Sequence, residues 1–121
     1  MSRRRPEDAI QRAVVEHLRC RGARGALYWH TPNGGLRTRA GAAVLKAMGT
    51  LAGVADICIL HNGKFFALEL KAPGGRSTAA QLAFRDSVNA AGGFASEAVG
   101  IDAGILFLES EAWGLLVGRT Q

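Results

Sequence analysis

The dipeptide Asn62-Gly63 constrains the fold of this chain more than any other feature, because it separates two runs rich in β-forming residues. The stretch reads 54-VADICILHNGKFFALELK-71, and Asn-Gly between two such runs is the strongest short-range signal of a β-hairpin with a two-residue turn. Such a turn pairs the residues that flank it. Counting outward from the turn, the register predicts that Asp56 lies directly opposite Glu69.

Side chains alternate between the two faces of a strand, so the hairpin sorts its residues into two sets. One face carries Asp56, Glu69 and Lys71. The other face carries large apolar residues and is predicted to face the core: Ile57, Ile59, Phe66, Leu68 and Leu70.

Two opposed carboxylates repel each other, because the Cβ atoms of such a pair are roughly 4.5–5.5 Å apart. A hard divalent cation would offset the repulsion, since proteins bind Mg²⁺ through a few carboxylates and waters. Lys71 could then hold the attacking water or neutralise charge on a phosphoryl oxygen. In a purely structural alternative, Asp56 and Lys71 frame an exposed sheet edge and Glu69 pairs with Lys71. The neighbours on this face are apolar and disfavour that alternative: Cys58, Leu60, Phe65 and Ala67.

Helix and strand signals continue through the rest of the chain. Pro6 fits the first position of a helix whose apolar residues recur at helical spacing until Gly22. The remaining expected elements are a strand over 26–30, a loop over 31–35, a helix over about 38–48, a helix capped by Ser77 and reaching about residue 91, a strand over 94–99, and a helix capped by Asp102 and reaching about residue 112. This order predicts an α/β protein in which helices pack on one mixed sheet.

The length of 121 residues suits one domain, residues 1–121, and is too short for two. The net charge of +5 and a pI of about 10.0 favour a polyanionic partner, although a basic protein without such a partner fits equally well. The two cysteines form no C-x-x-C motif and no disulfide framework, which predicts a reducing, cytoplasmic setting. We expect no membrane association, because signal-peptide and membrane-span patterns are both missing from the sequence.

Five short segments, in this order and spacing, resemble the motifs of one family: 7-EDAIQ-11, 32-PNGG-35, 53-GVADICIL-60, 69-ELK-71 and 77-STAAQ-81. An acid, a hairpin and then Glu-x-Lys resembles the PD-(D/E)XK nuclease superfamily. More narrowly, the chain is similar to a stand-alone VRR-NUC domain of the phage and bacterial type. The resemblance implies a restriction-endonuclease-like αβββαβ core, with a mixed sheet flanked by helices. One position departs from the pattern, since Ala55 stands where the superfamily has its name-giving proline.

The resemblance also implies roles for individual residues. Asp56 and Glu69 would be metal ligands, and the backbone carbonyl of Leu70 would be a third. Lys71 would be the catalytic lysine. The implied activity is a DNA endonuclease that uses Mg²⁺ or Mn²⁺ and hydrolyses phosphodiester bonds by attack of a metal-activated water.

Further residues enter the expected site through the same resemblance. Gln81 matches the family's helix glutamine and joins the catalytic group. Glu7 matches an N-terminal acid that could reach a second metal or a water on the metal. Basic residues at four positions are candidates for contacts to nucleic acid: Arg37, Arg39, Lys64 and Arg76.

The most detailed expectations concern the substrate and the oligomeric state. Stand-alone relatives resemble Holliday-junction resolvases, which act as dimers, so we expect a homodimer that could act on branched DNA. The apolar run 105-ILFLESEAWGLLV-117 offers surface for such a contact. Two alternatives stay open: a non-catalytic nucleic-acid-binding module on a nuclease scaffold, and a structural partner protein whose acids only form salt bridges.

Overall fold

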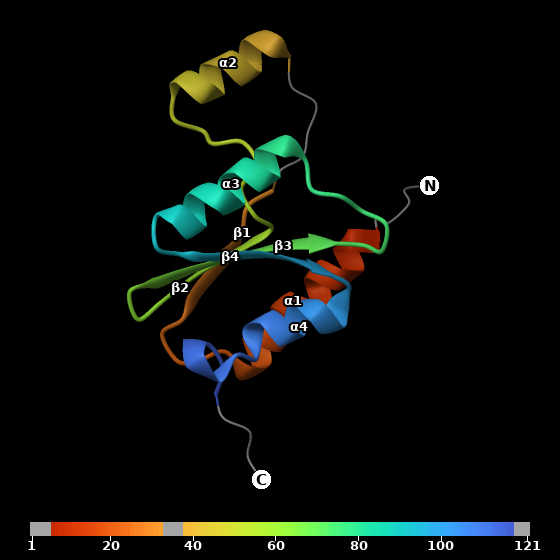
Figure 1. Cartoon of the computed structure of the whole chain (residues 1–121), viewed down its shortest axis with the longest axis vertical. Helices are drawn as coiled ribbons and strands as arrows, with labels where there is room; N and C mark the ends of the chain where they lie inside the picture. Colours follow the sequence, from red (N-terminus) through yellow and green to blue (C-terminus); the bar gives the residue numbers. More distant parts are fainter. Residues whose placement is uncertain (1–5, 33–37, 118–121) are drawn as a thin grey trace.

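A four-stranded sheet between helices forms the body of the protein in the computed structural model, which describes residues 6–32 and 38–117 (Figure 1). The elements are α1 (Pro6–Arg21), β1 (Leu27–His30), α2 (Arg39–Ala47), β2 (Ile57–His61), β3 (Lys64–Lys71), α3 (Ala79–Ala90), β4 (Phe94–Val99), α4 (Ile101–Leu108) and a 3₁₀ helix (Glu111–Trp113). The predicted αβββαβ order with a mixed sheet is confirmed. Helix α2 is inserted between β1 and β2, and α4 follows β4.

The strands lie in the order β1-β2-β3-β4. Neighbours among the first three strands are antiparallel, whereas β4 is parallel to β3. A parallel return needs a crossover connection, and α3 supplies it. Helices α1 and α4 lie on one face of the sheet and α3 lies on the other, with α2 beyond α3 and away from the sheet (Figure 1).

The predicted hairpin is confirmed, including its register. Asn62 and Gly63 both have positive φ angles, of 49° and 75°, which suits the two-residue turns of hairpins. His61 pairs with Lys64, and the pairing continues to Ile57 opposite Leu68. Continued one step past the end of β2, the same register would set Asp56 opposite Glu69.

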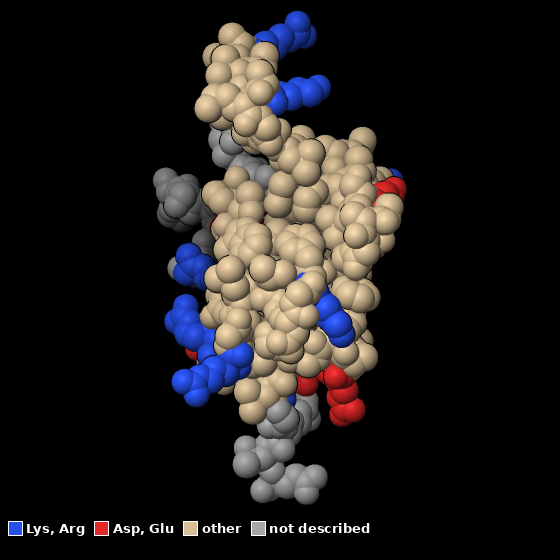
Figure 2. Space-filling view, turned by 90° about the vertical axis from the view of Figure 1, so that its left-hand side faces the viewer, with Lys and Arg blue, Asp and Glu red and all other residues tan. Residues whose placement is uncertain are grey.

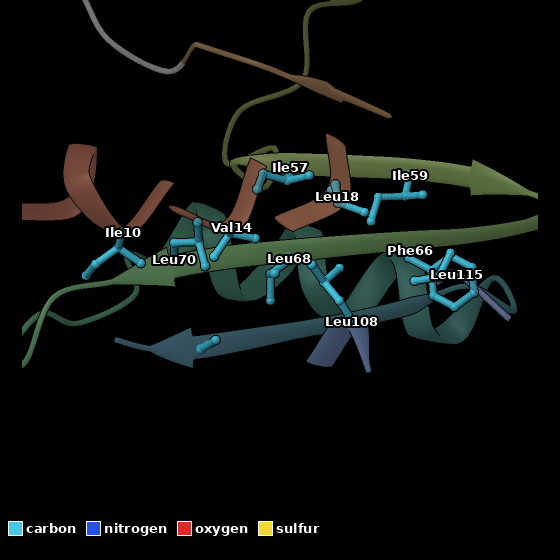
Figure 3. Close-up of a cluster of buried hydrophobic side chains, with 11 residues drawn as sticks. Ile10, Val14, Leu18, Ile57, Ile59, Phe66, Leu68, Leu70, Leu108 and Leu115 are labelled. Atoms are coloured by element: carbon cyan, nitrogen blue, oxygen red, sulfur yellow. The ribbon is translucent and has the colours of Figure 1, made fainter. Parts of the chain in front are cut away.

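The hydrophobic core lies between the sheet and the pair α1 and α4 (Figure 3). All five side chains predicted for the core face of the hairpin are buried there. Helix α1 adds Ile10, Val14 and Leu18, which recur at helical spacing. Gly104 lets α4 approach closely, because a Cβ atom at this position would lie 2.8 Å from Val14 Cγ2.

Helix α3 begins one residue later than the sequence predicts, because Thr78 and not Ser77 is its N-cap. The Thr78 hydroxyl accepts a hydrogen bond from the Gln81 backbone N–H, and the Gln81 side chain accepts one from the Thr78 N–H. This reciprocal capping box satisfies two backbone donors at once. Ser77 instead donates its hydroxyl hydrogen to Glu97 on β4.

The last helix also differs from the prediction. Asp102 lies inside the first turn of α4, and the N-cap position is held by Gly100 with a positive φ of 88°. The helix ends at Leu108, and a separate 3₁₀ helix follows. Part of the apolar run 105–117 is used by the core, since Leu108 and Leu115 are buried. Within the described ranges, no helix has the length and apolar character needed to cross a membrane.

Candidate active site

Asp56 and Glu69 meet at one end of the hairpin, on the face of the sheet that α3 covers. Asp56 precedes β2 by one residue, and its Oδ2 atom accepts a hydrogen bond of 2.7 Å from the backbone N–H of Leu70. Glu69 lies within β3 and is only 6% exposed. The hairpin therefore brings together the two acids that the sequence predicts as metal ligands.

The electrostatics of this pair favour a bound cation. Burial, which is the largest cause, acts together with the negative charge of Asp56 and a hydrogen bond with it, and the pKa of Glu69 is raised to about 8. The charge of Glu7 acts in the same direction, whereas the ammonium group of Lys71 lowers this pKa. A divalent cation between the carboxylates would remove the repulsion that makes Glu69 retain its proton.

Lys71 and Gln81 join the two acids in one hydrogen-bonded group. The ammonium group of Lys71, which is 6% exposed, donates to the Oε1 atom of Gln81 at 3.0 Å. The amide of Gln81 donates in turn to Glu69 Oε1 at 3.1 Å, and Lys71 Nζ lies 4.0 Å from that oxygen. Because Gln81 also closes the capping box of α3, the start of this helix is tied to the catalytic lysine that the sequence predicts.

The carbonyl of Leu70 is placed to act as a third oxygen donor. The N–H and C=O of one strand residue point to the same side of the strand. Since the Leu70 N–H points at Asp56, the Leu70 carbonyl also lies on the Asp56 side. In the described part of the chain, no three His, Cys, Asp or Glu side chains cluster closely enough to hold one ion. Two carboxylates and a carbonyl, completed by waters, suit Mg²⁺.

Glu7 lies near this group without joining the acid pair. A Cβ atom at Gly75 would lie 3.6 Å from Glu7 Oε2 and equally close to Lys71 Cβ, so Glu7 borders the loop after β3. Its charge contributes to the raised pKa of Glu69. Its role toward a second metal or a water stays a prediction.

Two site neighbours were missed by the sequence reasoning. His30, which the sequence predicts only as the last residue of the strand over 26–30, ends β1, and its Nδ1 atom lies 2.7 Å from the carbonyl oxygen of Asp56. Glu97 stands beside Glu69 in the parallel register of β3 and β4. It accepts a hydrogen bond from Ser77 and lies 3.6 Å from Arg85. Both neighbours depend on strand pairing between distant segments, for which the local sequence holds no signal.

The basic residues predicted to contact nucleic acid do not form one cluster. Arg39 begins α2, Lys64 begins β3 at the hairpin turn, and Arg76 lies in the connection from β3 to α3. All three are exposed. Arg37 lies outside the described residues. Arg76 is the member of this set that is nearest in sequence to Lys71 and Gln81.

Comparison with known proteins supports the fold. No protein-family model and no curated protein matches the sequence. A solved structure described as a "VRR_NUC domain protein" is similar, with a TM-score of 0.68 and 25% identity over 85% of this chain and 84% of the other. A second one, described as a "VRR_NUC domain", shares the fold with a TM-score of 0.56 and 17% identity over 87% of this chain and 96% of the other. Motifs, fold and structural likeness together support a VRR-NUC domain in this chain, of the kind named for the first of these structures.

Proposed function

We propose that the chain, residues 1–121, is a single-domain, metal-dependent DNA endonuclease that hydrolyses phosphodiester bonds. The observation that carries the proposal is the pair of opposed carboxylates, Asp56 and Glu69, beside the buried ammonium group of Lys71. A structural ion pair between Glu69 and Lys71 would not require Asp56, whose charge raises the pKa of Glu69. The second acid is explained by a cation that both acids bind.

Mg²⁺ and Mn²⁺ fit the donors that the site offers, because both are hard cations that prefer oxygen ligands. Asp56 and Glu69 would bind the ion through carboxylate oxygens, and the Leu70 carbonyl would add a neutral ligand. When bound, such an ion supplies the positive charge that activates the attacking water and neutralises charge on the phosphate. Glu7, near Lys71, would hold a water or a second ion.

Lys71 and Gln81 would act on the phosphate and the water. An ammonium group beside the acids can donate a hydrogen bond to the attacking water or to a phosphoryl oxygen as charge develops. Gln81 fixes the position of that ammonium group without removing its charge, because an amide oxygen accepts a hydrogen bond but not the proton itself. The capping box then couples this position to the start of α3.

DNA as the substrate is supported by the nuclease family and by the net charge of +5. Arg39, Lys64 and Arg76 are exposed and would contact phosphates, with Arg37 joining them from outside the described residues. Phosphate contacts fix the position of a duplex without reading its sequence. Action on branched DNA of the Holliday-junction kind would require two such sites, one for each strand to be cut.

A homodimer would provide those two sites, and the apolar surface of this chain suggests where it forms. On the α3 side of the sheet, five apolar side chains are exposed or half-buried, and we call this set the open face: Leu27, Trp29, Leu51, Leu60 and Phe65. Trp29 is 41% exposed and Leu51 is 61% exposed. A groove of about 850 Å³ between α2 and α3 adjoins the open face through Leu51.

Two features favour a second copy of the chain as the occupant. The open face has no charged member, and Figure 2 shows an uncharged area directly beneath α2, so two copies could meet without burying charge. The five residues of the open face offer no cation for DNA phosphates, and the cations of α2, Arg39 and Lys46, lie outside this set. Helix α2 has no buried residue and presents Val44 and Met48 to solvent. A projecting helix with exposed apolar side chains and a largely apolar groove on one chain suit a two-fold contact.

Cleavage assays on single-stranded, duplex, flap and four-way DNA, each with Mg²⁺, Mn²⁺ or a chelator, test the proposed activity. We expect metal-dependent cleavage by the wild-type chain and a loss of about 10²–10³-fold or more in Lys71→Ala. Arg19→Ala, at the far end of α1, removes one exposed positive charge and should cleave normally. DNA binding without cleavage by the wild-type chain would instead favour a non-catalytic binding module.

Light scattering at micromolar concentration tests the assembly. The wild-type chain should have the mass of a dimer, and Leu60→Lys in the open face should yield monomers. Leu106→Lys, on exposed α4 surface in the 105–117 run, is the matched control and should remain dimeric. A monomeric wild-type chain, with and without DNA, would exclude the dimer. Monomers caused by Leu106→Lys alone would move the interface to the C-terminal run.

A further inference from the structure

Asp56 is held from both neighbouring strands, although it lies one residue outside β2. Its backbone carbonyl lies 2.7 Å from His30 Nδ1 and accepts a hydrogen bond of 3.3 Å from the Thr31 N–H. Its carboxylate accepts the hydrogen bond from Leu70 N–H on β3. The residue is therefore fixed at its backbone by the end of β1 and at its side chain by β3.

The shorter contact to the carbonyl depends on a side chain, and hence on the residue type at position 30. A carbonyl oxygen can only accept a hydrogen bond, so His30 Nδ1 must carry the proton in this arrangement. His30 is exposed and does not belong to the hydrophobic core. Packing therefore does not explain the position of this ring, whereas the bond to Asp56 does.

We propose that His30 is a positioning residue for Asp56, an inference that rests on the proposed metal-dependent function. The residue before Asp56 explains why this hydrogen bond from His30, which we call the clamp, is useful. A proline at position 55 would fix its own φ angle near −65°, whereas Ala55 leaves that angle free. The imidazole of His30 supplies a restraint on the other side of the Asp56 α-carbon, and the carboxylate then stays opposite Glu69.

Removal of the clamp should weaken metal binding more than it weakens the fold. Groups that hydrogen-bond to metal ligands typically change metal affinity or activity by about 10–100-fold. We expect His30→Ala to bind Mn²⁺ at least about tenfold more weakly than the wild-type chain and to lose a similar factor in kcat. The KM for DNA should change little, because His30 acts through Asp56 and not through the substrate.

Two conservative variants separate the hydrogen bond from the bulk of the ring. In His30→Asn, the amide nitrogen lies the same number of bonds from the α-carbon as Nδ1, so the donor is retained. In His30→Gln, the amide is one bond further away, and the donor is displaced. We expect His30→Asn to recover Mn²⁺ affinity to within about threefold and His30→Gln to resemble His30→Ala.

Two measurements decide the proposal: Mn²⁺ titration calorimetry, and amide exchange of Leu70 in the metal-free protein. Leu70 N–H should exchange faster in His30→Ala and His30→Gln, because a loosened Asp56 releases it, but not in His30→Asn. Wild-type exchange and Mn²⁺ affinity in His30→Ala would overturn the proposal, as would a His30→Asn variant as impaired as His30→Ala. If the wild-type chain neither binds Mn²⁺ nor cleaves DNA, the proposed function fails, and Leu70 exchange still decides whether His30 positions Asp56.

Discussion

The two faces of the sheet are held by different kinds of contact, and β3 shows this within one strand. Its side chains toward α1 and α4 are Phe66, Leu68 and Leu70, which are buried in the core. Its side chains toward α3 end in Glu69 and Lys71, which are buried as well but ionisable. The α1 side is held by apolar packing, whereas the α3 side is held at this end by hydrogen bonds and ion pairs.

The residues that stabilise the fold and the residues of the candidate active site therefore lie on opposite faces of one sheet. Apolar burial stabilises the fold without directional requirements. The polar contacts to α3 place Gln81 against Glu69 and Glu97 against Ser77 and Arg85, and their net contribution to stability is small. Substitutions on the α1 side should therefore change the free energy of unfolding, and substitutions on the α3 side should change mainly metal binding and cleavage.

The largest expected effect on stability comes from the core face. Leu68 is fully buried, and Leu68→Ala should lower the free energy of unfolding by about 2–5 kcal/mol, through lost burial and the cavity left behind. Urea denaturation of the metal-free protein measures this loss. Asp56→Asn, across the sheet, should leave the free energy of unfolding unchanged or slightly higher while abolishing cleavage. Loss of the fold in Asp56→Asn would show that the acid is structural and would break the comparison between the faces.

The hairpin explains why so much of the site could be predicted from the sequence. Asn62-Gly63 fixes the turn, and a period of two residues then assigns each side chain to a face. Asp56, Glu69 and Lys71 are thus placed by short-range rules alone. The core residues of α1 follow from helical spacing in the same way.

The remaining parts of the site depend on contacts that local rules do not contain. Glu97 reaches Glu69 only because β4 returns parallel to β3 after α3. His30 reaches Asp56 only because the end of β1 aligns with the start of β2. The cap of α3 could have been predicted, since Gln81 lies three residues after Thr78 and forms a capping box, whereas Ser77 has no such partner at that spacing.

The second prediction concerns the charge buried on the α3 side. Folded Glu69 keeps its proton up to a pKa of about 8, whereas in the unfolded chain it titrates near its ordinary value of 4.5. Between these values the folded state binds more protons, so the free energy of unfolding falls as pH rises and stays low above about pH 8. The free energy of unfolding of Glu69→Gln should not fall in this way as pH rises. At pH 9, without metal, the variant should be more stable than the wild-type chain by at least about 1 kcal/mol.

Thermal unfolding of both proteins with a chelator, from pH 4 to pH 9, measures this difference. Groups that titrate equally in the two proteins cancel, so the difference should vanish near pH 4 and grow toward pH 9. Mg²⁺ should stabilise the wild-type chain at high pH and should stabilise Glu69→Gln less, because binding to the folded state alone raises stability. If the difference in stability between the two proteins stayed constant across this range, Glu69 would not be the titrating group. Burial of its charge on the α3 side would then not destabilise the fold.

The smallest expected effect tests whether the polar contacts of α3 contribute as little to the free energy of unfolding as the difference between the two faces implies. Glu97 accepts a hydrogen bond from Ser77 and lies 3.6 Å from Arg85, with both ionic side chains partly exposed. Glu97→Gln keeps an oxygen for Ser77 and removes the charge opposite Arg85, so the free energy of unfolding should fall by less than about 1 kcal/mol. Cleavage should stay near the wild-type rate, because the capping box holds Gln81 independently of Glu97. Urea denaturation and a cleavage assay on the same preparation measure both quantities. A loss as large as that of Leu68→Ala would mean that a single polar contact holds α3 as firmly as apolar packing holds α1, and the two faces would no longer differ in how they are held.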